Sequence, residues 1–339
     1  MANIMLTYRC NLRCPYCFAN EFVNHSKYDI TLENFKAALD FIKTSDEGHV
    51  GLIGGEPTIH EHFREILQIL ADDDAIHSVT IYTNGIQMDT CLDFMENTKF
   101  HMLVNCNSPE DIGEQQFRKL QENLDRLFQI EGVWKRANLG INLYKDELNY
   151  TYIIDLLKHC RLHRVRMSVT VPNLEEEKKA DSLEYLASRK AYILRFIQDC
   201  EQADAAPYFD CNVIPKCLWT EEEREIIGGV ISKFHLKRTN LLGDHSFCRP
   251  VIDILPDLTA VRCFGTSDFT KAPIKDFRCL DDLRNYYVNM IDSRVTGCMK
   301  ADICRDCYER KVLLCTAGCL AFIGDELKAK IAAYENGQS

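Results

Sequence analysis

Short apolar stretches rich in β-branched residues recur along the first half of the chain, between segments whose apolar residues repeat every three or four positions. The first pattern is typical of buried strands and the second of amphipathic helices. Six strands are expected, at residues 3–7, 50–53, 79–83, 102–105, 139–143 and 165–171. Because helical segments separate most of these strands, the pattern predicts βα units and an α/β fold with a parallel sheet.

The alternation stops near residue 205. A long helix is expected at 182–199, followed by short strands, turns and closely spaced cysteines, and then by an amphipathic helix at 325–334. We therefore expect two domains, an α/β domain over residues 1–205 and a small cysteine-rich α+β domain over residues 206–339 that ends in a helix.

The composition excludes several classes of protein. With 339 residues and 46% apolar content, the chain can bury a sizeable core. No stretch approaches the roughly 20 apolar residues of a membrane span and no signal peptide opens the chain, so we expect a cytoplasmic protein without a membrane partner. Its formal charge of −11 argues against nucleic acid as a partner. Because the cytosol keeps thiols reduced, metal clusters explain the 17 cysteines better than disulfides do.

Three cysteines follow the first expected strand with a spacing suited to an iron-sulfur cluster. Cys10, Cys14 and Cys17 have the pattern C-x3-C-x2-C. Three thiolates can bind only three irons of a four-iron cubane, so the fourth iron keeps an open coordination position. A zinc site needs four ligands, and no fourth cysteine or histidine stands at zinc spacing here.

This motif, with the aromatic Phe18 beside its last cysteine, resembles that of the radical S-adenosylmethionine (radical SAM) superfamily. The resemblance implies a partial (β/α)6 barrel, a 4Fe-4S cluster on the three cysteines, and SAM bound to the open iron and cleaved to a 5′-deoxyadenosyl radical. The second expected strand ends in Gly54, Gly55, Glu56 and Pro57. These residues are similar to the family's GGEP motif, which holds the amino group of SAM.

Further polar residues at strand ends are candidates for the SAM pocket. They are Asn84 in a Thr-Asn-Gly turn, Asn105, Asn107 and Ser108 after the fourth strand, Asn142 on the fifth, and Arg166 on the sixth. Polar residues that face inward on a barrel strand line its interior, and an arginine can bind a carboxylate through two hydrogen bonds. A capped loop before the next helix explains residues 105–108 equally well.

The second group of cysteines resembles the SPASM or twitch extension of radical SAM enzymes, which carries auxiliary 4Fe-4S clusters. Its members are Cys248, Cys263, Cys298, Cys304, Cys307, Cys315 and Cys319. The SPASM order implies one cluster on Cys248, Cys263 and Cys319 and another on Cys304, Cys307 and Cys315. The match departs from the family at Leu258, where glycine is expected, and has no late closing cysteine, so Cys298, Cys211 or Cys217 would supply missing ligands. One cluster, two clusters and a zinc site on the last four cysteines all remain open.

Cys106, Cys211 and Cys217 are candidate hydrogen-atom donors to a substrate radical, the last two if iron does not bind them. The resemblance implies hydrogen abstraction from a ribosomally made peptide, with a separate leader-binding protein as a partner and a flavodoxin or ferredoxin-type protein as reductant. A small-molecule dehydrogenase and a sulfatase-type protein maturase are the alternative enzymes. A noncatalytic iron-sulfur protein is the alternative of another class, but it would have no use for a SAM site.

Overall fold

The computed structural model describes residues 2–24, 28–170, 181–238, 241–298 and 301–335. It divides into two compact units, each made of two chain segments. Unit 1 contains residues 1–140 and 250–286, and unit 2 contains residues 141–249 and 287–339. The boundary expected near residue 205 falls inside unit 2, and the division into consecutive domains stays a prediction.

Unit 1 is built on parallel strands that follow one another in the sheet in chain order. They are β1 (Ala2–Met5), β2 (His49–Ile53), β3 (Ser78–Thr83), β4 (Phe100–Asn105) and the start of β5 (Ala137–Leu143). On the other side of β1, β8 (Ile252–Ile254) adds as a further parallel strand, and β9 (Thr259–Val261) and β10 (Ala272–Pro273) continue antiparallel. A strand from the cysteine-rich part of the sequence thus lies directly beside β1.

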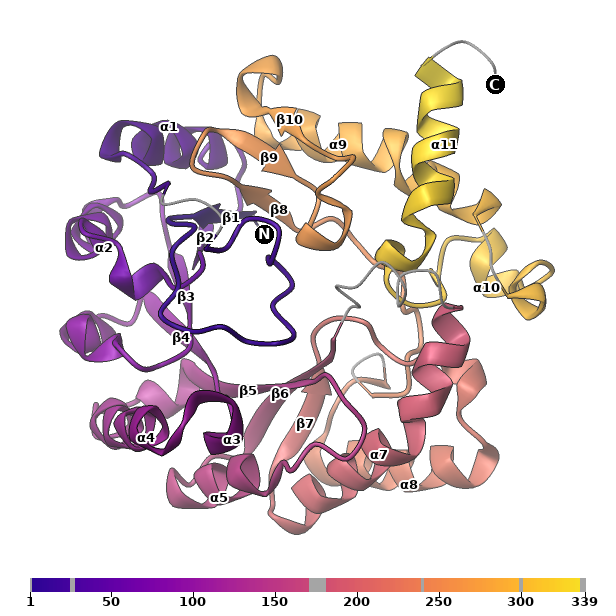
Figure 1. The fold of residues 1–339 in the computed structure, drawn as a ribbon, viewed down its shortest axis with the longest axis horizontal. Helices are drawn as coiled ribbons and strands as arrows, with labels where there is room; N and C mark the ends of the chain where they lie inside the picture. The colour runs from indigo at the N-terminus through magenta and orange to yellow at the C-terminus, as the bar shows by residue number, and fades with distance from the viewer. Residues whose placement is uncertain (1, 25–27, 171–180, 239–240, 299–300, 336–339) are drawn as a thin grey trace. The chain divides into compact units, whose positions relative to one another are not determined.

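The helices of unit 1 are α1 (Leu32–Ile42), α2 (Phe63–Asp72), α3 (Pro109–Ile112) and α4 (Glu114–Phe128). Figure 1 shows α1, α2 and α4 on one side of strands β1 to β4, and the indigo loop that follows β1 on the other side. The hydroxyl of Thr31 caps α1 by accepting a hydrogen bond from the Asn34 backbone at 3.1 Å. The cysteine loop and these helices therefore lie on opposite sides of the strands.

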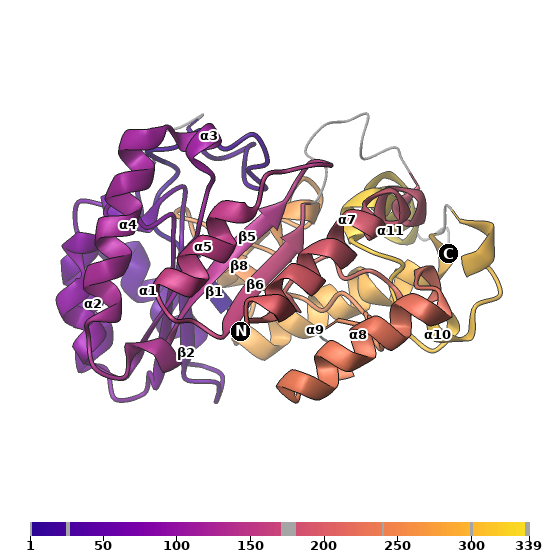
Figure 2. The ribbon, with the colours of Figure 1, turned by 90° about the horizontal axis from the view of Figure 1, so that it is seen from below.

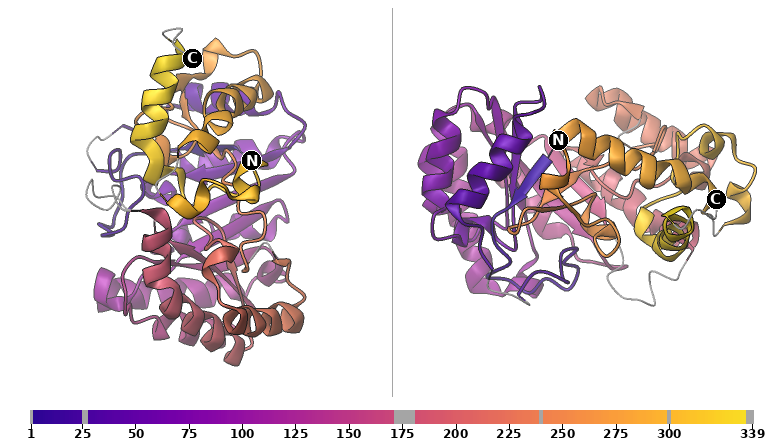
Figure 3. Two further views of the ribbon diagram at one scale, coloured as in Figure 1. Left: turned by 90° about the vertical axis from the view of Figure 1, so that its right-hand side faces the viewer. Right: turned by 90° about the horizontal axis from the view of Figure 1, so that it is seen from above.

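Unit 2 contains the end of β5, then β6 (Arg164–Val169) and β7 (Ala206–Phe209), which pair in parallel. Its main helices are α5 (Thr151–His159), α7 (Ser182–Gln202), α8 (Glu221–Phe234), α10 (Tyr308–Lys311) and α11 (Gly324–Glu335). Figure 2 shows α7 beside α8, and Figure 3 shows α11 as the yellow helix that leads to the C-terminus. Helix α9 (Leu280–Met290) crosses from one unit to the other.

All six expected strands are present, within a few residues of the expected bounds, although Val171 lies outside the described residues. The expected helices at 182–199 and 325–334 correspond to α7 and α11. The parallel pairing of β8 with β1 was not expected, because its short apolar run sits among turns and cysteines. In the part of the chain that is described, none of the helices has the length and apolar character needed to cross a membrane.

Candidate metal centre

The loop that carries Cys10, Cys14 and Cys17 begins at the carboxyl end of β1 in unit 1. The side chains of Cys10 and Cys17 pack against an apolar cluster that includes Met5 and Phe264. The pKa of Cys10 is raised to about 11, mainly by burial, with smaller contributions to the rise from the charges of Glu56 and Cys17. Burial raises the pKa of Cys14 to about 12, with the charges of Cys10 and Cys17 as the next causes. The three thiols are therefore close enough to interact, and a cationic cluster would relieve the repulsion between their thiolates.

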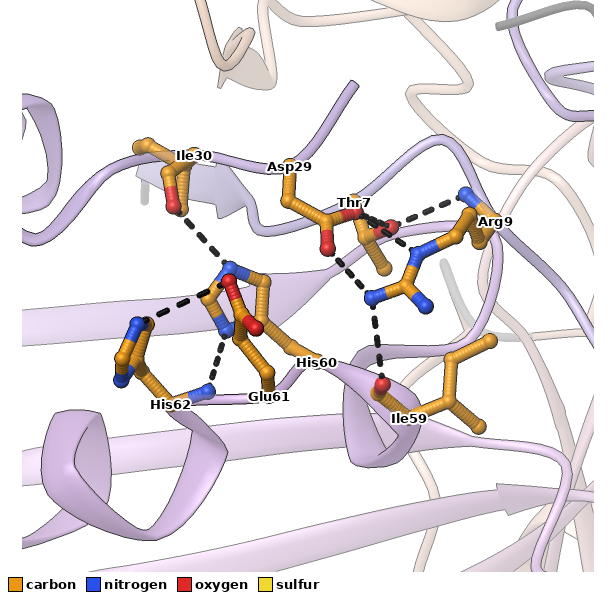
Figure 4. Close-up of polar contacts among 8 residues, drawn as sticks. All are labelled: Thr7, Arg9, Asp29, Ile30, Ile59, His60, Glu61 and His62. Atoms are coloured by element: carbon orange, nitrogen blue, oxygen red, sulfur yellow. Dashed lines mark hydrogen bonds and ion pairs between the residues drawn. The ribbon is translucent and has the colours of Figure 1, made fainter. Parts of the chain in front are cut away.

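A polar network holds the start of this loop, as Figure 4 shows. The Arg9 guanidinium, which directly precedes Cys10, pairs with the Asp29 carboxylate and donates to the Ile59 carbonyl at 3.4 Å. The Thr7 hydroxyl also donates to Asp29 and accepts from the Arg9 backbone at 2.9 Å. Burial raises the pKa of Asp29, but the hydrogen bonds from Arg9 and Thr7 outweigh it, so the net pKa is lowered. The carboxylate therefore stays charged at neutral pH and fixes the residue next to the first cysteine.

The same network reaches a buried histidine. His60 lies with its Nε2 at 3.0 Å from the Ile30 carbonyl, and its Nδ1 accepts from the His62 backbone at 3.1 Å. Burial lowers the pKa of His60. The neutral ring with its proton on Nε2 satisfies both contacts, which ties the segment after Pro57 to the segment before α1.

The glycines of the Gly54-Gly55-Glu56 turn allow the turn to contact the cysteine loop. A Cβ on Gly55 would lie 2.2 Å from the Arg9 carbonyl oxygen and 2.9 Å from the Cys10 Cβ. The Glu56 backbone donates to that same carbonyl at 2.9 Å. The Gly54 backbone is also close, since a Cβ there would lie 3.0 Å from the Thr7 carbonyl. Only a residue without a side chain fits at position 55, so this motif is needed for the loop to pack as it does.

The Glu56 carboxylate is buried and already has several donors. One oxygen accepts from the Thr58 and Thr83 hydroxyls, each at 2.7 Å, and the other accepts from the Asn84 backbone at 2.7 Å. Burial raises the pKa of Glu56, and these hydrogen bonds oppose the rise. The side chain therefore joins the end of β2 to the end of β3, and its role in binding the SAM amino group stays a prediction.

Two asparagines from neighbouring strand ends contact the cysteine loop. The Asn84 side-chain amide donates to Asn11 Oδ1 at 2.7 Å. After β4, Asn107 Oδ1 accepts from the Cys14 thiol at 3.6 Å and from the Tyr16 hydroxyl. Sequence reasoning selected Asn84 and Asn107 as pocket residues, and the structure brings both of them to the loop.

The other candidates after β4 have different surroundings. Ser108 is buried and caps α3, with its hydroxyl 3.2 Å from the Asp111 backbone nitrogen. Cys106 is buried, and its thiol lies 3.5 Å from the Val104 carbonyl oxygen. Asn105 is the last residue of β4 and is half-buried. The capping interpretation of this segment therefore applies to Ser108, and the hydrogen-donor role of Cys106 stays a prediction.

Asn142 and Arg166 form a network of their own in unit 2. Arg166 donates to Asn142 Oδ1 at 2.9 Å and to Asp210 Oδ2 at 3.0 Å, and the Ser168 hydroxyl donates to Asn142 Oδ1 at 2.6 Å. The guanidinium thus already binds a carboxylate, that of Asp210 beyond β7. Its proposed pairing with a SAM carboxylate stays a prediction.

The later cysteines are divided between the two units. Cys263 lies in unit 1, with its thiol 3.5 Å from the Thr266 hydroxyl. In unit 2, the Cys248 backbone donates to the Thr316 hydroxyl, which donates to the Gly318 carbonyl next to Cys319. The Cys298 thiol lies 3.5 Å from the Arg294 carbonyl oxygen, and burial raises its pKa, which the charge of Lys330 lowers and that of Glu326 raises. Cys304, Cys307 and Cys315 all lie in unit 2, where the charges of Cys307 and Cys315 affect the pKa of Cys304.

Within the described residues, no three histidine, cysteine or acidic side chains already converge as they would around a single metal ion. Two donor sets nevertheless fit iron-sulfur clusters, because the first loop and the segment from Cys304 to Cys315 each bring several thiols close together. Metal binding is often coupled to local folding, and the thiols must also lose their protons.

Several residues around the first loop were not selected from the sequence. Asp29, Thr58, Thr83 and Tyr16 all contact the loop or the Gly54-Glu56 turn. Tyr16 lies between Cys14 and Cys17, so its position in the sequence indicates that it is close to the cluster loop. The sequence gives no such indication for Asp29, because its contact with Arg9 depends on the isolated antiparallel β-bridge between Thr7 and Asp29.

Residues 4–130 match the family model described as the radical SAM superfamily. This segment includes the three-cysteine loop, the Gly54-Glu56 turn and Asn107, so the site described above lies inside the matched region. Residues 4–130 of the chain therefore match a radical SAM domain.

The curated relatives it matches are enzymes. A GTP 3′,8-cyclase of Haemophilus ducreyi is 24% identical over 152 residues, which cover 42% of this chain and 44% of that protein. An S-adenosylmethionine-dependent nucleotide dehydratase of Selenomonas ruminantium is 37% identical over 87 residues, which cover 25% of this chain and 30% of that protein. The chain thus spans less than half the length of each of these two relatives.

Solved structures match over more of the chain. The structure of anSMEcpe with bound AdoMet and the Kp18Cys peptide has a TM-score of 0.64 at 15% identity, covering 100% of this chain and 98% of that one. Streptococcus suis SuiB bound to S-adenosylmethionine has a TM-score of 0.60 at 15% identity, covering 94% of this chain and 72% of that one. At this identity the likeness is one of fold, and it confirms the expected α/β class with a mainly parallel sheet.

Proposed function

We propose that this protein is a radical SAM enzyme that abstracts a hydrogen atom from a ribosomally made peptide. The observation that carries the proposal is the loop of Cys10, Cys14 and Cys17 at the end of β1, packed against the Gly55 backbone and contacted by Asn84 and Asn107. These three thiols would hold a 4Fe-4S cluster, which would supply the electron for reductive cleavage of SAM.

The residues of the chain have defined tasks in this proposal. The three thiols hold the cluster, and the Arg9–Asp29 pair fixes the entry to their loop. Gly54 and Gly55 let their turn pack against the cysteine loop, and Glu56 keeps that turn fixed to the end of β3. The half-buried, apolar setting of the loop limits the access of water to the reacting atoms.

A peptide substrate is supported by the fold as a whole. Among the similar structures, SuiB was solved with its precursor peptide SuiA, and anSMEcpe with two peptides. The cysteine-rich segment after β7 would carry one or two auxiliary 4Fe-4S clusters, which would take up an electron or ligate the substrate. A flavodoxin or ferredoxin-type protein would reduce the first cluster, and a separate protein would present a leader sequence.

A nucleotide or another small molecule is the second candidate substrate. The relatives named as a GTP 3′,8-cyclase and a nucleotide dehydratase favour it. Each of these two matches covers less than half of this chain, so neither compares the whole protein with a nucleotide-processing enzyme.

Substrate class is tested by incubating the reconstituted, reduced protein and SAM with either a library of short peptides or a panel of nucleoside triphosphates. We expect 5′-deoxyadenosine formation to rise at least several-fold above the substrate-free rate with a peptide, together with a mass change in that peptide. A comparable rise with a nucleotide alone would overturn the peptide assignment. Failure to form 5′-deoxyadenosine under any condition would favour a noncatalytic iron-sulfur protein.

A further inference from the structure

We propose that Cys217 is the fourth ligand of an auxiliary iron-sulfur cluster whose other ligands are Cys304, Cys307 and Cys315. The inference rests on the proposed function, since it specifies one of the auxiliary clusters named there. Cys217 comes from the segment between β7 and α8, far before the three cysteines in the sequence. All four belong to unit 2.

The two residues that flank Cys217 are held against the segment that carries the other cysteines. The Lys216 ammonium pairs with the Glu309 carboxylate at 2.6 Å, across 93 positions of sequence. Leu218 packs against the apolar cluster that contains Cys304 and Ala317. With both neighbours anchored, the Cys217 backbone is fixed beside the Cys304–Cys315 segment.

The position of Leu218 is also fixed from α7. The Lys190 ammonium donates to the Leu218 carbonyl at 3.0 Å and pairs with Glu223 in the first turn of α8 at 2.8 Å. The placement of Cys217 near the later cysteines therefore depends on the packing of several elements and not on one side chain.

The thiols interact electrostatically. Burial raises the pKa of Cys217, and the charge of Cys315 is the next cause, with a smaller effect from Cys307. The pKa of Cys304 is raised to about 11, mainly by burial; Arg310 lowers it, and the nearby Cys217, Cys315 and Cys307 contribute to the rise. Cys217 therefore lies near Cys304, Cys307 and Cys315, and four thiolates in one place need a compensating cation.

The surroundings of Cys315 also suit a bound cluster. Its sulfur accepts a hydrogen bond from the Ala317 backbone at 3.2 Å and another from the Ser246 hydroxyl at 3.4 Å. Hydrogen bonds to sulfur stabilise thiolate ligands and help to set the reduction potential of a cluster.

The segment between Cys307 and Cys315 contains a buried cation. Arg310 is 3% exposed and donates to the carbonyls of Thr316 at 2.7 Å, Val295 at 2.7 Å and Cys298 at 2.6 Å. Its charge lowers the pKa of Cys304, in opposition to burial. Arg310 therefore supports the ligand loop and offsets part of the negative charge of four thiolates.

The experiment uses the Cys10→Ala, Cys14→Ala, Cys17→Ala variant, reconstituted anaerobically, so that only auxiliary iron is counted. In this background, Cys217→Ser is compared with Cys211→Ser, which tests the other candidate ligand of the same segment, six positions earlier. We expect Cys217→Ser to lose between about one and four irons per chain, because a cubane that lacks one ligand loses an iron or is released. The reduced protein should also show a changed electron paramagnetic resonance spectrum, whereas Cys211→Ser should match the background in both measurements.

Unchanged iron content and spectrum in Cys217→Ser would overturn the inference, as would a loss confined to Cys211→Ser or a site filled by zinc instead of iron. Far-UV circular dichroism of both variants separates ligand loss from misfolding. If Cys217→Ser does misfold, Lys216→Met keeps the thiol but removes its anchor, and it should release auxiliary iron to a chelator several-fold faster than the background. Because these measurements do not depend on SAM cleavage, a protein that forms no 5′-deoxyadenosine could still confirm this ligand set.

Discussion

A buried carboxyl group on β8 provides a quantitative test of the packing between β8 and β1. Asp253 is 4% exposed, and its Oδ1 accepts a hydrogen bond from the Asn3 side-chain amide at 2.7 Å. Burial raises the pKa of Asp253 to about 7, and the Asn3 hydrogen bond offsets only part of the rise. Within the described structure, Asn3 Oδ1 has no hydrogen-bond partner. When Asp253 is protonated, its hydroxyl can donate a hydrogen bond to that oxygen, so that the carboxylic acid and the amide are joined by two hydrogen bonds.

The raised pKa determines the sign of the pH dependence. An unfolded aspartate titrates near 3.9, so between about pH 4 and pH 7 the folded state binds a proton that the unfolded state releases. The stabilisation by Asp253 is therefore complete below pH 4, falls as the pH rises to about 7, and is constant above that. A difference of about three pKa units corresponds to at most about 4 kcal/mol of stability lost across this range.

The perturbation is Asp253→Asn, which keeps the shape of the neutral acid and cannot ionise. Its amide can replace the carboxyl proton as donor to Asn3, so we expect its stability to lie within about 1 kcal/mol of wild type at pH 5. At pH 8 the variant should be more stable than wild type by about 1–4 kcal/mol. Asp302→Asn, at a side chain that is 90% exposed, is the matched control and should show no such trend.

The assay is urea unfolding of wild type and variants in the same metal state, followed by tryptophan fluorescence at pH 5, 6, 7 and 8. Every other titrating group is common to wild type and variant, so the difference in unfolding free energy isolates Asp253. A difference that does not change between pH 5 and pH 8 would refute the assignment of a neutral, buried Asp253.

Two further predictions concern the first cysteine loop. Gly55→Ala would place a methyl group 2.2 Å from the Arg9 carbonyl oxygen, so it should lose most of the iron bound by that loop, whereas Gly228→Ala, with nothing within 4 Å of the added carbon, should keep it. Equal iron content in the two reconstituted variants would contradict the contact. Thr83→Val removes one donor to the buried Glu56 carboxylate and should lower the unfolding free energy in urea by about 1–3 kcal/mol at pH 7; an unchanged value would show that this hydrogen bond does not stabilise the turn.

Local sequence patterns were sufficient for much of the fold. Apolar periodicity identifies β1 to β6 and helices such as α7, because the same alternation that buries one face of an element is visible in its own residues. The cysteine spacing and the two glycines identify the cluster loop and its neighbouring turn for the same reason, since both are contained in a few consecutive residues.

Contacts between distant segments could not be predicted in this way. The pairing of Asn3 with Asp253 spans 250 positions, and nothing near either residue indicates the other. Arg166 was selected as a ligand for SAM, but the direction of its side chain depends on the neighbouring strand β7. Asp210 follows that strand and accepts a hydrogen bond from Arg166. Cys217 could not be assigned to a particular group of cysteines until the packing of its neighbours was known.

The central claim is that Cys10, Cys14 and Cys17 hold the cluster that cleaves SAM. The most direct measurement is iron content and 5′-deoxyadenosine formation on reduction, in wild type and in the Cys10→Ala, Cys14→Ala, Cys17→Ala variant. We predict that the variant loses about four irons and all 5′-deoxyadenosine but keeps its auxiliary iron. A variant that still forms 5′-deoxyadenosine, or a wild-type protein that binds zinc and forms none, would contradict the account.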